Sequence, residues 1–143
     1  MPQISVQNLQ RTVRINAGSL EKFAAQAVQQ CLKLPARGTT VLTTLPEISV
    51  LIVSDRRMAK LHEQFLHQRG PTDVLTFEHG EIFIGAETAR RNARAFKNSL
   101  ENEVRLYVVH GLLHLHGFDD RTEPDGQRMK TTQEKILASL VDV

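Results

Sequence analysis

The sequence has no tryptophan, one tyrosine and a single cysteine among its 143 residues. One cysteine cannot form a disulfide within the chain, which suits a reducing compartment, so we expect a cytoplasmic protein. No stretch approaches the roughly 18 consecutive apolar residues of a membrane-spanning helix, and the N-terminal stretch lacks the apolar core of a signal peptide. Cys31 falls at an apolar position of a predicted helix, so we expect it to be buried.

The chain also lacks a strong charge of either sign. Its formal net charge is +2, which permits an anionic partner such as RNA without requiring one. Its apolar fraction of 41% and charged fraction of 24% are ordinary for a globular protein. The length and the absence of repeats or long linkers predict a single domain over residues 1–143.

Hydrophobic periodicity predicts an alternation of strands and helices. Apolar and β-branched runs predict four strands, at residues 3–7, 47–53, 73–77 and 81–85. Helical spacing predicts five helices, at residues 19–33, 55–68, 86–96, 100–115 and 124–140. We therefore expect an α+β fold, an α/β sandwich in which a small mixed sheet of about four strands packs with about five helices.

The segment HGLLHLHGFDD, residues 110–120, places three histidines and two aspartates at the end of a long apolar helix. His110 and His114 are four residues apart, so their imidazoles project one turn apart from the same side of the helix. Helices present pairs of zinc ligands in this way. Gly111 stands where a metallopeptidase HExxH helix carries its glutamate base, which disfavours that class of enzyme.

Completing such a site requires the chain to turn after the helix. Gly117 can end the helix in a left-handed conformation, with Phe118 anchoring the turn against the core. Asp119 or Asp120 could then close the site as a third ligand. His116 projects in another direction and is expected to be structural or solvated.

The same segment resembles the signature H-G-x-L-H-L-x-G-[YF]-D-H of the YbeY family, the bacterial rRNA maturation factors described as endoribonucleases. PTDVLTF at 71–77 resembles the family's P-T-D-V-L-S-F, and GEIFIG at 80–85 corresponds to a G-D-I-x-I stretch. The resemblance spans essentially the whole chain. It implies a metal-dependent, single-strand-specific endoribonuclease that acts in maturation of the 16S rRNA 3′ end and in ribosome quality control. The implied partners are rRNA and the small ribosomal subunit, with neither DNA nor a membrane expected.

The resemblance also implies the ligands of one Zn²⁺ ion, with a metal-bound water as the reactive group. His110 and His114 fall on the first two ligand positions, and Asp120 replaces the third family histidine. Aspartate can ligate zinc, but its charge should raise the pKa of bound water above the value of about 7 found at three-histidine sites. A harder ligand set also admits other divalent metals, such as nickel. Alternatively, Asp120 is only a turn residue and the site is degenerate.

A second departure lies in LHEQFLHQRG, residues 61–70, where Leu66 replaces an arginine of the family that is thought to matter for activity. An arginine near the metal would bind phosphate and stabilise charge that develops during cleavage. Arg69 or Arg56 could substitute for it. If neither does, the chain could be a catalytically weak ribosome-assembly factor with a structural metal.

Basic residues mark a candidate RNA-binding face on the helix after the predicted hairpin. Arg90, Arg94 and Lys97 are spaced i, i+4 and i+7, with Arg91 beside them. Such a stripe could follow a phosphate backbone without reading bases, or it could be an ordinary solvated face. A metal-dependent hydrolase of another substrate stays open as well, because fold and ligand set do not fix the substrate.

Overall fold

The computed structural model describes residues 1–140 and confirms the predicted α+β fold. Each predicted strand and helix is present there, with ends shifted by a residue or two. The strands are β1 (Gln3–Asn8), β2 (Glu47–Val53), β3 (Val74–Phe77) and β4 (Glu81–Gly85). The helices are α1 (Ala17–Leu32), α2 (Asp55–Leu66), α3 (Ala86–Ala95), α4 (Leu100–Leu115) and α5 (Glu123–Leu140). No helix within these residues is long and apolar enough to cross a membrane.

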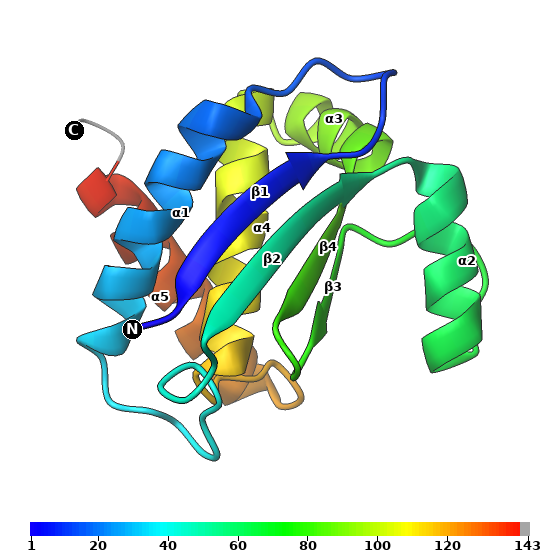
Figure 1. Ribbon diagram of the computed structural model, residues 1–143. Helices are drawn as coiled ribbons and strands as arrows, with labels where there is room; N and C mark the ends of the chain where they lie inside the picture. The colour runs from blue at the N-terminus through cyan, green and yellow to red at the C-terminus, as the bar shows by residue number, and fades with distance from the viewer. Residues whose placement is uncertain (141–143) are drawn as a thin grey trace.

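The strands form one mixed sheet in the order β1-β2-β4-β3 (Figure 1). β1 pairs in parallel with β2, and β2 in parallel with β4. β3 runs antiparallel to β4 at one edge, as the hairpin signal predicts. The parallel pairs require crossover connections, which α1 supplies between β1 and β2.

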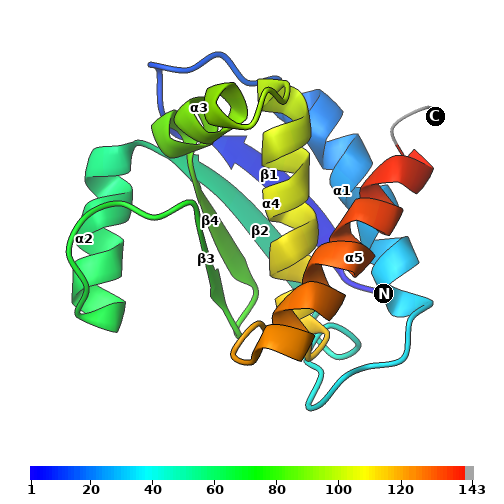
Figure 2. The ribbon, with the colours of Figure 1, turned by 180° about the vertical axis from the view of Figure 1, so that it is seen from behind.

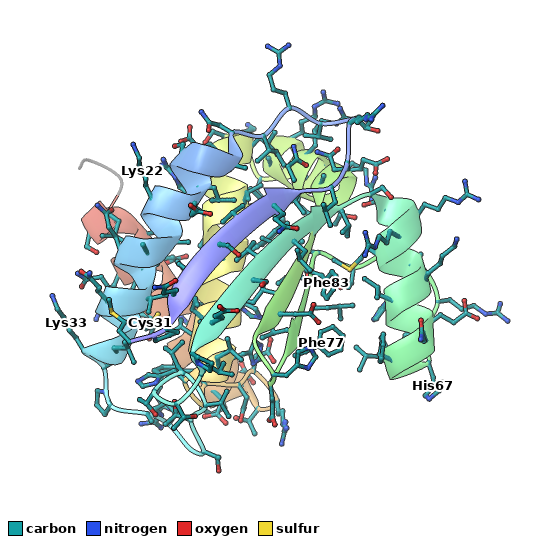
Figure 3. The ribbon with its side chains drawn as sticks, in the orientation of Figure 1. Lys22, Cys31, Lys33, His67, Phe77 and Phe83 are labelled. Carbon is teal, nitrogen blue, oxygen red and sulfur yellow. The ribbon has the colours of Figure 1, made fainter. Side chains whose placement is uncertain are left out.

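The two faces of the sheet are covered unequally (Figures 1 and 2). α1 and α4 pack against one face, and α5 crosses α4 obliquely and also contacts α1 (Figure 2). The larger core lies there and includes Leu20, Phe23, Val28, Ile48, Val50, Ile52, Ile82, Ile84, Val108 and Leu112. On the opposite face α2 contributes Met58 to a smaller cluster with Leu51, Val53, Leu75 and Phe83. Phe77 and Phe83 lie between the sheet and α2 in Figure 3.

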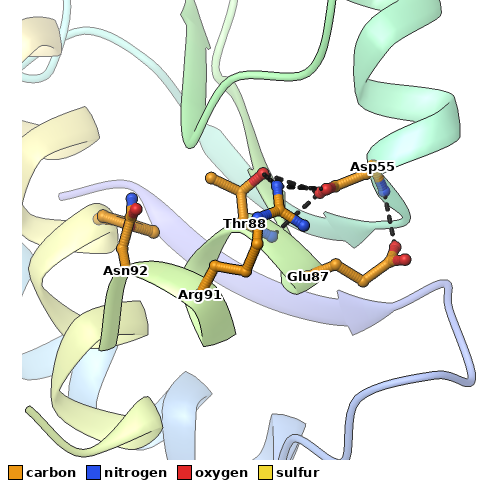
Figure 4. Close-up of polar contacts among 6 residues, drawn as sticks. Asp55, Glu87, Thr88, Arg91 and Asn92 are labelled. Carbon is orange, nitrogen blue, oxygen red and sulfur yellow. Dashed lines mark hydrogen bonds and ion pairs between the residues drawn. The ribbon is translucent and has the colours of Figure 1, made fainter. Parts of the chain in front are cut away.

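The first turns of α2 and α3 cap each other (Figure 4). Glu87 on α3 accepts a hydrogen bond of 2.8 Å from the Asp55 N–H. Asp55 accepts in return from the Thr88 N–H, at 3.0 Å, and from the Thr88 hydroxyl, at 2.9 Å. Arg91 pairs with the second oxygen of Asp55 at 2.7 Å. Because free N–H groups at helix starts need acceptors, this network fixes the N-terminal end of α2 against α3.

Gly111 allows α4 to approach the sheet closely. A Cβ atom built at this position would lie 2.9 Å from side-chain carbons of buried Ile82 on β4. Any larger residue would push α4 away from β4. The glycine that replaces the metallopeptidase glutamate therefore has a packing role.

Cys31 is fully buried in the larger core, as predicted. Burial raises the pKa of its thiol to about 12, because the charged thiolate is poorly solvated there. A thiol with such a pKa is inert as a nucleophile at neutral pH.

Candidate metal centre

His110 and His114 lie one turn apart near the C-terminal end of α4, both partly buried. Their Nε2 atoms approach to 3.0 Å, and their rings meet edge to face at 78°. Two Nε2 atoms that face each other at this distance can both turn a lone pair toward one ion. The helical spacing of the sequence thus produces the expected pair.

A glycine turn brings the third group back to the histidines. Gly117 has φ +90°, and its N–H donates to the His114 carbonyl at 3.0 Å. The Phe118 N–H donates to the Leu113 carbonyl at 3.0 Å, which completes a Schellman motif, and the Phe118 ring is buried. The turn was expected from Gly117, and it is present.

One donor atom from each of His110, His114 and Asp120 lies within 4.8 Å of the other two. Tetrahedral zinc ligands lie about 3.4 Å apart when the metal–ligand bonds are about 2.1 Å long. The histidine Nε2 atoms, 3.0 Å apart, lie slightly closer than this spacing, and the donor oxygen of exposed Asp120 lies within 4.8 Å of both. The donor set fits a small divalent cation, although aspartate makes it harder than three histidines.

Burial, reinforced by the neighbouring His110 ring, lowers the pKa of His114 below its ordinary value, against the opposing effect of Asp120. A lowered pKa favours the neutral imidazole, which is the form that binds metals.

Gln133 on α5 is a site residue that sequence reasoning missed. Its Oε1 atom accepts a hydrogen bond from the Nδ1 atom of His110. With the proton held on Nδ1, the Nε2 lone pair of His110 is free to face His114. Metal-binding histidines are commonly oriented in this way by a second acceptor. Only packing of α5 on α4 reveals this contact, because 23 residues separate the two side chains.

His116 has a structural role, which is one of the two roles that the sequence predicts for it. It is buried, and its Nε2 lies 2.7 Å from the Leu34 carbonyl oxygen. Its Nδ1 lies 3.0 Å from the Thr40 hydroxyl. These contacts connect the end of α4 to the loop between α1 and β2, which leaves His116 outside the ligand set.

A cleft of about 370 Å³ opens beside His110 and His114, between the end of α4 and the β3 edge of the sheet. Leu66, at the end of α2, lines this cleft and is 49% exposed. The departure from the family's arginine therefore falls in the same cleft as the candidate metal centre.

Arg121 lines the cleft as well, whereas the lining residues among those described include neither Arg56 nor Arg69. Arg121 directly follows Asp120, a proximity that the sequence already offered as a signal.

The basic residues predicted to bind RNA lie on α3 and in the turn that follows it, and their role stays a prediction. α3 ends at Ala95, and Lys97 adopts a left-handed conformation with φ 55° in the turn that follows. Arg90 and Arg94 stay on the helix, and Arg91 is engaged by Asp55. Lys97 instead lines a second hollow, which also includes His110.

Fold and site together define an α+β protein with a helix-borne candidate metal centre beside an open cleft. A family model described as "Endoribonuclease YbeY" matches residues 5–141, and the chain belongs to this family. It is accordingly an enzyme of the hydrolase class, in a family named for cleavage within RNA chains.

Individual relatives agree with this assignment. The chain is 36% identical over 122 residues to "Endoribonuclease YbeY" of Gluconobacter oxydans, covering 80% of this chain and 73% of that one. It is 38% identical over 103 residues to the protein of the same name from Thermus thermophilus, covering 64% and 74% of the two chains. The solution structure of TM1509 from Thermotoga maritima superposes with a TM-score of 0.61 at 27% identity. That match covers 95% of this chain and 90% of the other.

Proposed function

We propose that the protein is a metal-dependent endoribonuclease that cleaves single-stranded RNA in the cytoplasm. Its proposed roles are maturation of the 16S rRNA 3′ end and ribosome quality control on the small subunit. The observation that supports this most is the convergence of donor atoms from His110, His114 and Asp120 within 4.8 Å, with both histidines at the wall of a cleft also lined by Arg121.

Each of these side chains has a separate task in the proposed site. His110 and His114 hold the ion through Nε2, with Gln133 keeping the His110 proton on Nδ1. Asp120 contributes an oxygen ligand and one negative charge. When bound, the metal supplies Lewis acidity, which makes a hydroxyl nucleophile more acidic. Zinc suits two imidazoles, and the oxygen ligand extends the range to other divalent ions, including nickel.

Arg121 is the cationic side chain that lines the cleft, together with the carboxylates Glu78 and Asp119, and we assign to it contact with the phosphate. Guanidinium groups bind phosphate oxygens in pairs and stabilise the negative charge that grows on them as the bond breaks. Arg121 lines the cleft, so we assign to it the role that the family's arginine would fill at position 66. Arg69 and Arg56 become less suitable candidates for this role.

The proposal is tested by metal content and cleavage measured on the same preparations. We expect one equivalent of zinc in the wild type, and His110→Ala and His114→Ala should lose both the metal and cleavage of a single-stranded oligoribonucleotide. Asp120→Ala should weaken metal binding less, because both imidazole ligands remain on α4, whereas each histidine variant leaves only one imidazole. His79→Ala is the matched control, since His79 is exposed on the hairpin and pairs with Glu81. Retention of one equivalent in both histidine variants would contradict the ligand assignment.

A catalytically weak assembly factor with a structural metal is the second candidate. Leu66 favours it, because an apolar side chain occupies the cleft wall where the family carries arginine. The two functions differ in cells that lack the gene. If wild type and His114→Ala restore 16S rRNA 3′-end processing equally, the assembly role is supported and the nuclease role is contradicted.

A further inference from the structure

A second hollow, of about 530 Å³, adjoins the metal cleft on the side away from Leu66. It lies between the corner that joins α3 to α4 and the exposed side of α5. His110 and Val74 line both hollows. A chain that passes the candidate metal centre therefore meets this second hollow next.

Phe96 lines this hollow and is 73% exposed, although it belongs to the most apolar class of side chains. Single exposed apolar residues are common and need no explanation by themselves. Phe96 differs because its ring borders a hollow that contains a candidate metal ligand. An exposed aromatic ring in such a place offers a flat surface on which a nucleobase can stack.

The turn that follows Phe96 places Lys97 in a left-handed backbone conformation that residues with a Cβ atom rarely adopt. The Asn98 N–H donates to the Ala93 carbonyl at 2.8 Å, and Lys97 occupies the left-handed position where glycine is usual. Residues with a Cβ atom adopt this conformation at a cost in stability. The lysine side chain that the turn retains lines the hollow beside Phe96.

Two exposed lysines at the hollow are positioned to contact a phosphate group near Phe96. Lys97 and Lys130 line it from two different elements. Of the carboxylates that also line it, Glu103 is buried and accepts hydrogen bonds from Asn98 and Tyr107. Asp73 accepts from the Val74 N–H at 2.7 Å. Asp73 is half-buried and Glu134 is exposed, so the lining carries three carboxylates and two ammonium groups, and contact with a phosphate depends on the two exposed lysines.

We infer that Phe96, Lys97 and Lys130 form a nucleotide subsite, in which the base of a single-stranded RNA stacks on Phe96 while the lysines contact its phosphate. This subsite rests on the proposed nuclease function and extends it to a nucleotide beside the scissile bond. A base inside a duplex has both faces covered by neighbouring base pairs, so stacking on Phe96 favours single strands.

Binding of a single-stranded oligoribonucleotide that carries 2-aminopurine tests the subsite, with zinc-loaded protein at low salt. We expect Phe96→Ala to weaken binding by about 5- to 100-fold, the range for loss of one aromatic stacking partner, and to abolish the fluorescence change of the stacked base. Phe96→Trp should retain both. Leu9→Ala is the control, because Leu9 is 46% exposed at the end of β1 and lines neither hollow.

Lys97→Gly separates RNA contact from folding. Glycine relieves the left-handed conformation, so this variant should unfold at an equal or higher temperature. It should still bind RNA more weakly, with a shallower dependence on salt, because one phosphate contact is lost. Zinc affinity should be unchanged in all of these variants.

The outcomes distinguish the subsite from the nuclease function. If the wild type binds and cleaves RNA while Phe96→Ala matches it in affinity and fluorescence, the subsite is wrong and the nuclease function stands. If the wild type neither binds nor cleaves single-stranded RNA, both proposals are wrong. An equal loss in Leu9→Ala would also overturn the assignment to Phe96.

Discussion

The two walls of the metal cleft are built in opposite ways. The α4 wall carries His110 and His114 on a helix that is packed against the sheet through Gly111 and Ile82. The opposite wall carries Leu66 on the last turn of α2. Met58, near the other end, is the one buried residue of that helix. One wall is part of the core, and the other is an exposed helix end.

This difference explains where the chain can depart from its family without losing the fold. A change on the α4 wall disturbs the larger hydrophobic core, whereas a change at Leu66 alters a half-exposed side chain. Substitutions in the core cost far more stability than those on the surface. The α4 wall thus determines the position of the two candidate histidine ligands, and the α2 wall can change the charge of the cleft at little cost in stability.

A larger side chain at Gly111 should destabilise the packing of α4 against the sheet. Gly111→Val places side-chain atoms within about 3 Å of Ile82, and overpacking of this kind costs about 3 kcal/mol in the free energy of unfolding. Urea denaturation measures it. The same substitution at Gly126 on α5, where the nearest atom to a Cβ would be 3.8 Å away, should change stability by less than about 0.5 kcal/mol. Equal losses at both positions would show that the close approach of α4 to β4 is unimportant.

Removing the acceptor behind His110 should weaken metal binding without unfolding the wall. Gln133→Leu keeps a similar volume and leaves the His110 Nδ1–H without its acceptor, so zinc affinity should fall by about 10- to 100-fold. Gln133→Glu keeps an acceptor and should retain zinc binding. Competition with a chromophoric chelator measures the affinity, and Gln127→Leu on the same helix is the control. Unchanged affinity in Gln133→Leu would remove Gln133 from the site.

Local spacing made much of the α4 wall predictable from sequence. The i, i+4 histidines, the glycine turn and the aspartates lie within eleven consecutive residues, so helix geometry and turn chemistry determine most of their arrangement. The strands and helices were predictable for the same reason, because their hydrophobic periods are strong.

Residues that approach from distant segments could not be predicted in this way. Gln133 reaches His110 through the packing of α5 on α4, and Leu66 reaches the cleft through the position of α2. The RNA-binding role of the basic residues on and after α3 stays a prediction, and the structure adds only that Lys97 lies in the turn beyond the helix end at Ala95. Helix ends depend on capping and tertiary contacts, which periodicity does not report.

Removing the contacts between the N-terminal end of α2 and α3 should make α2 more mobile. Asp55→Ala removes the acceptor for the Thr88 N–H and the partner of Arg91, at a cost of about 1 kcal/mol. Hydrogen exchange should rise in α2 and the first turn of α3, while α4 amides and zinc affinity stay unchanged. Asp55→Asn keeps one acceptor and should show a smaller effect. Faster exchange in α4 as well would mean that the two walls are not independent.

Restoring a cation at Leu66 should have the smallest effect on stability and a measurable effect on activity. Leu66 is half exposed, so Leu66→Arg buries no charge and should shift the free energy of unfolding by less than about 0.5 kcal/mol. One added charge-assisted contact to phosphate should raise kcat/KM on single-stranded RNA by about 3- to 10-fold.

Gln68→Arg adds the same charge just beyond α2, outside the residues that line the cleft, and Leu66→Lys adds a cation that cannot bind phosphate in a bidentate way. We expect Leu66→Arg to exceed both controls. Because Arg121 lines the same cleft, Arg121→Ala should lower activity more in the wild type than in Leu66→Arg. Equal rates for Leu66→Arg and Gln68→Arg would show that the α2 wall contributes only to the general electrostatic field of the protein.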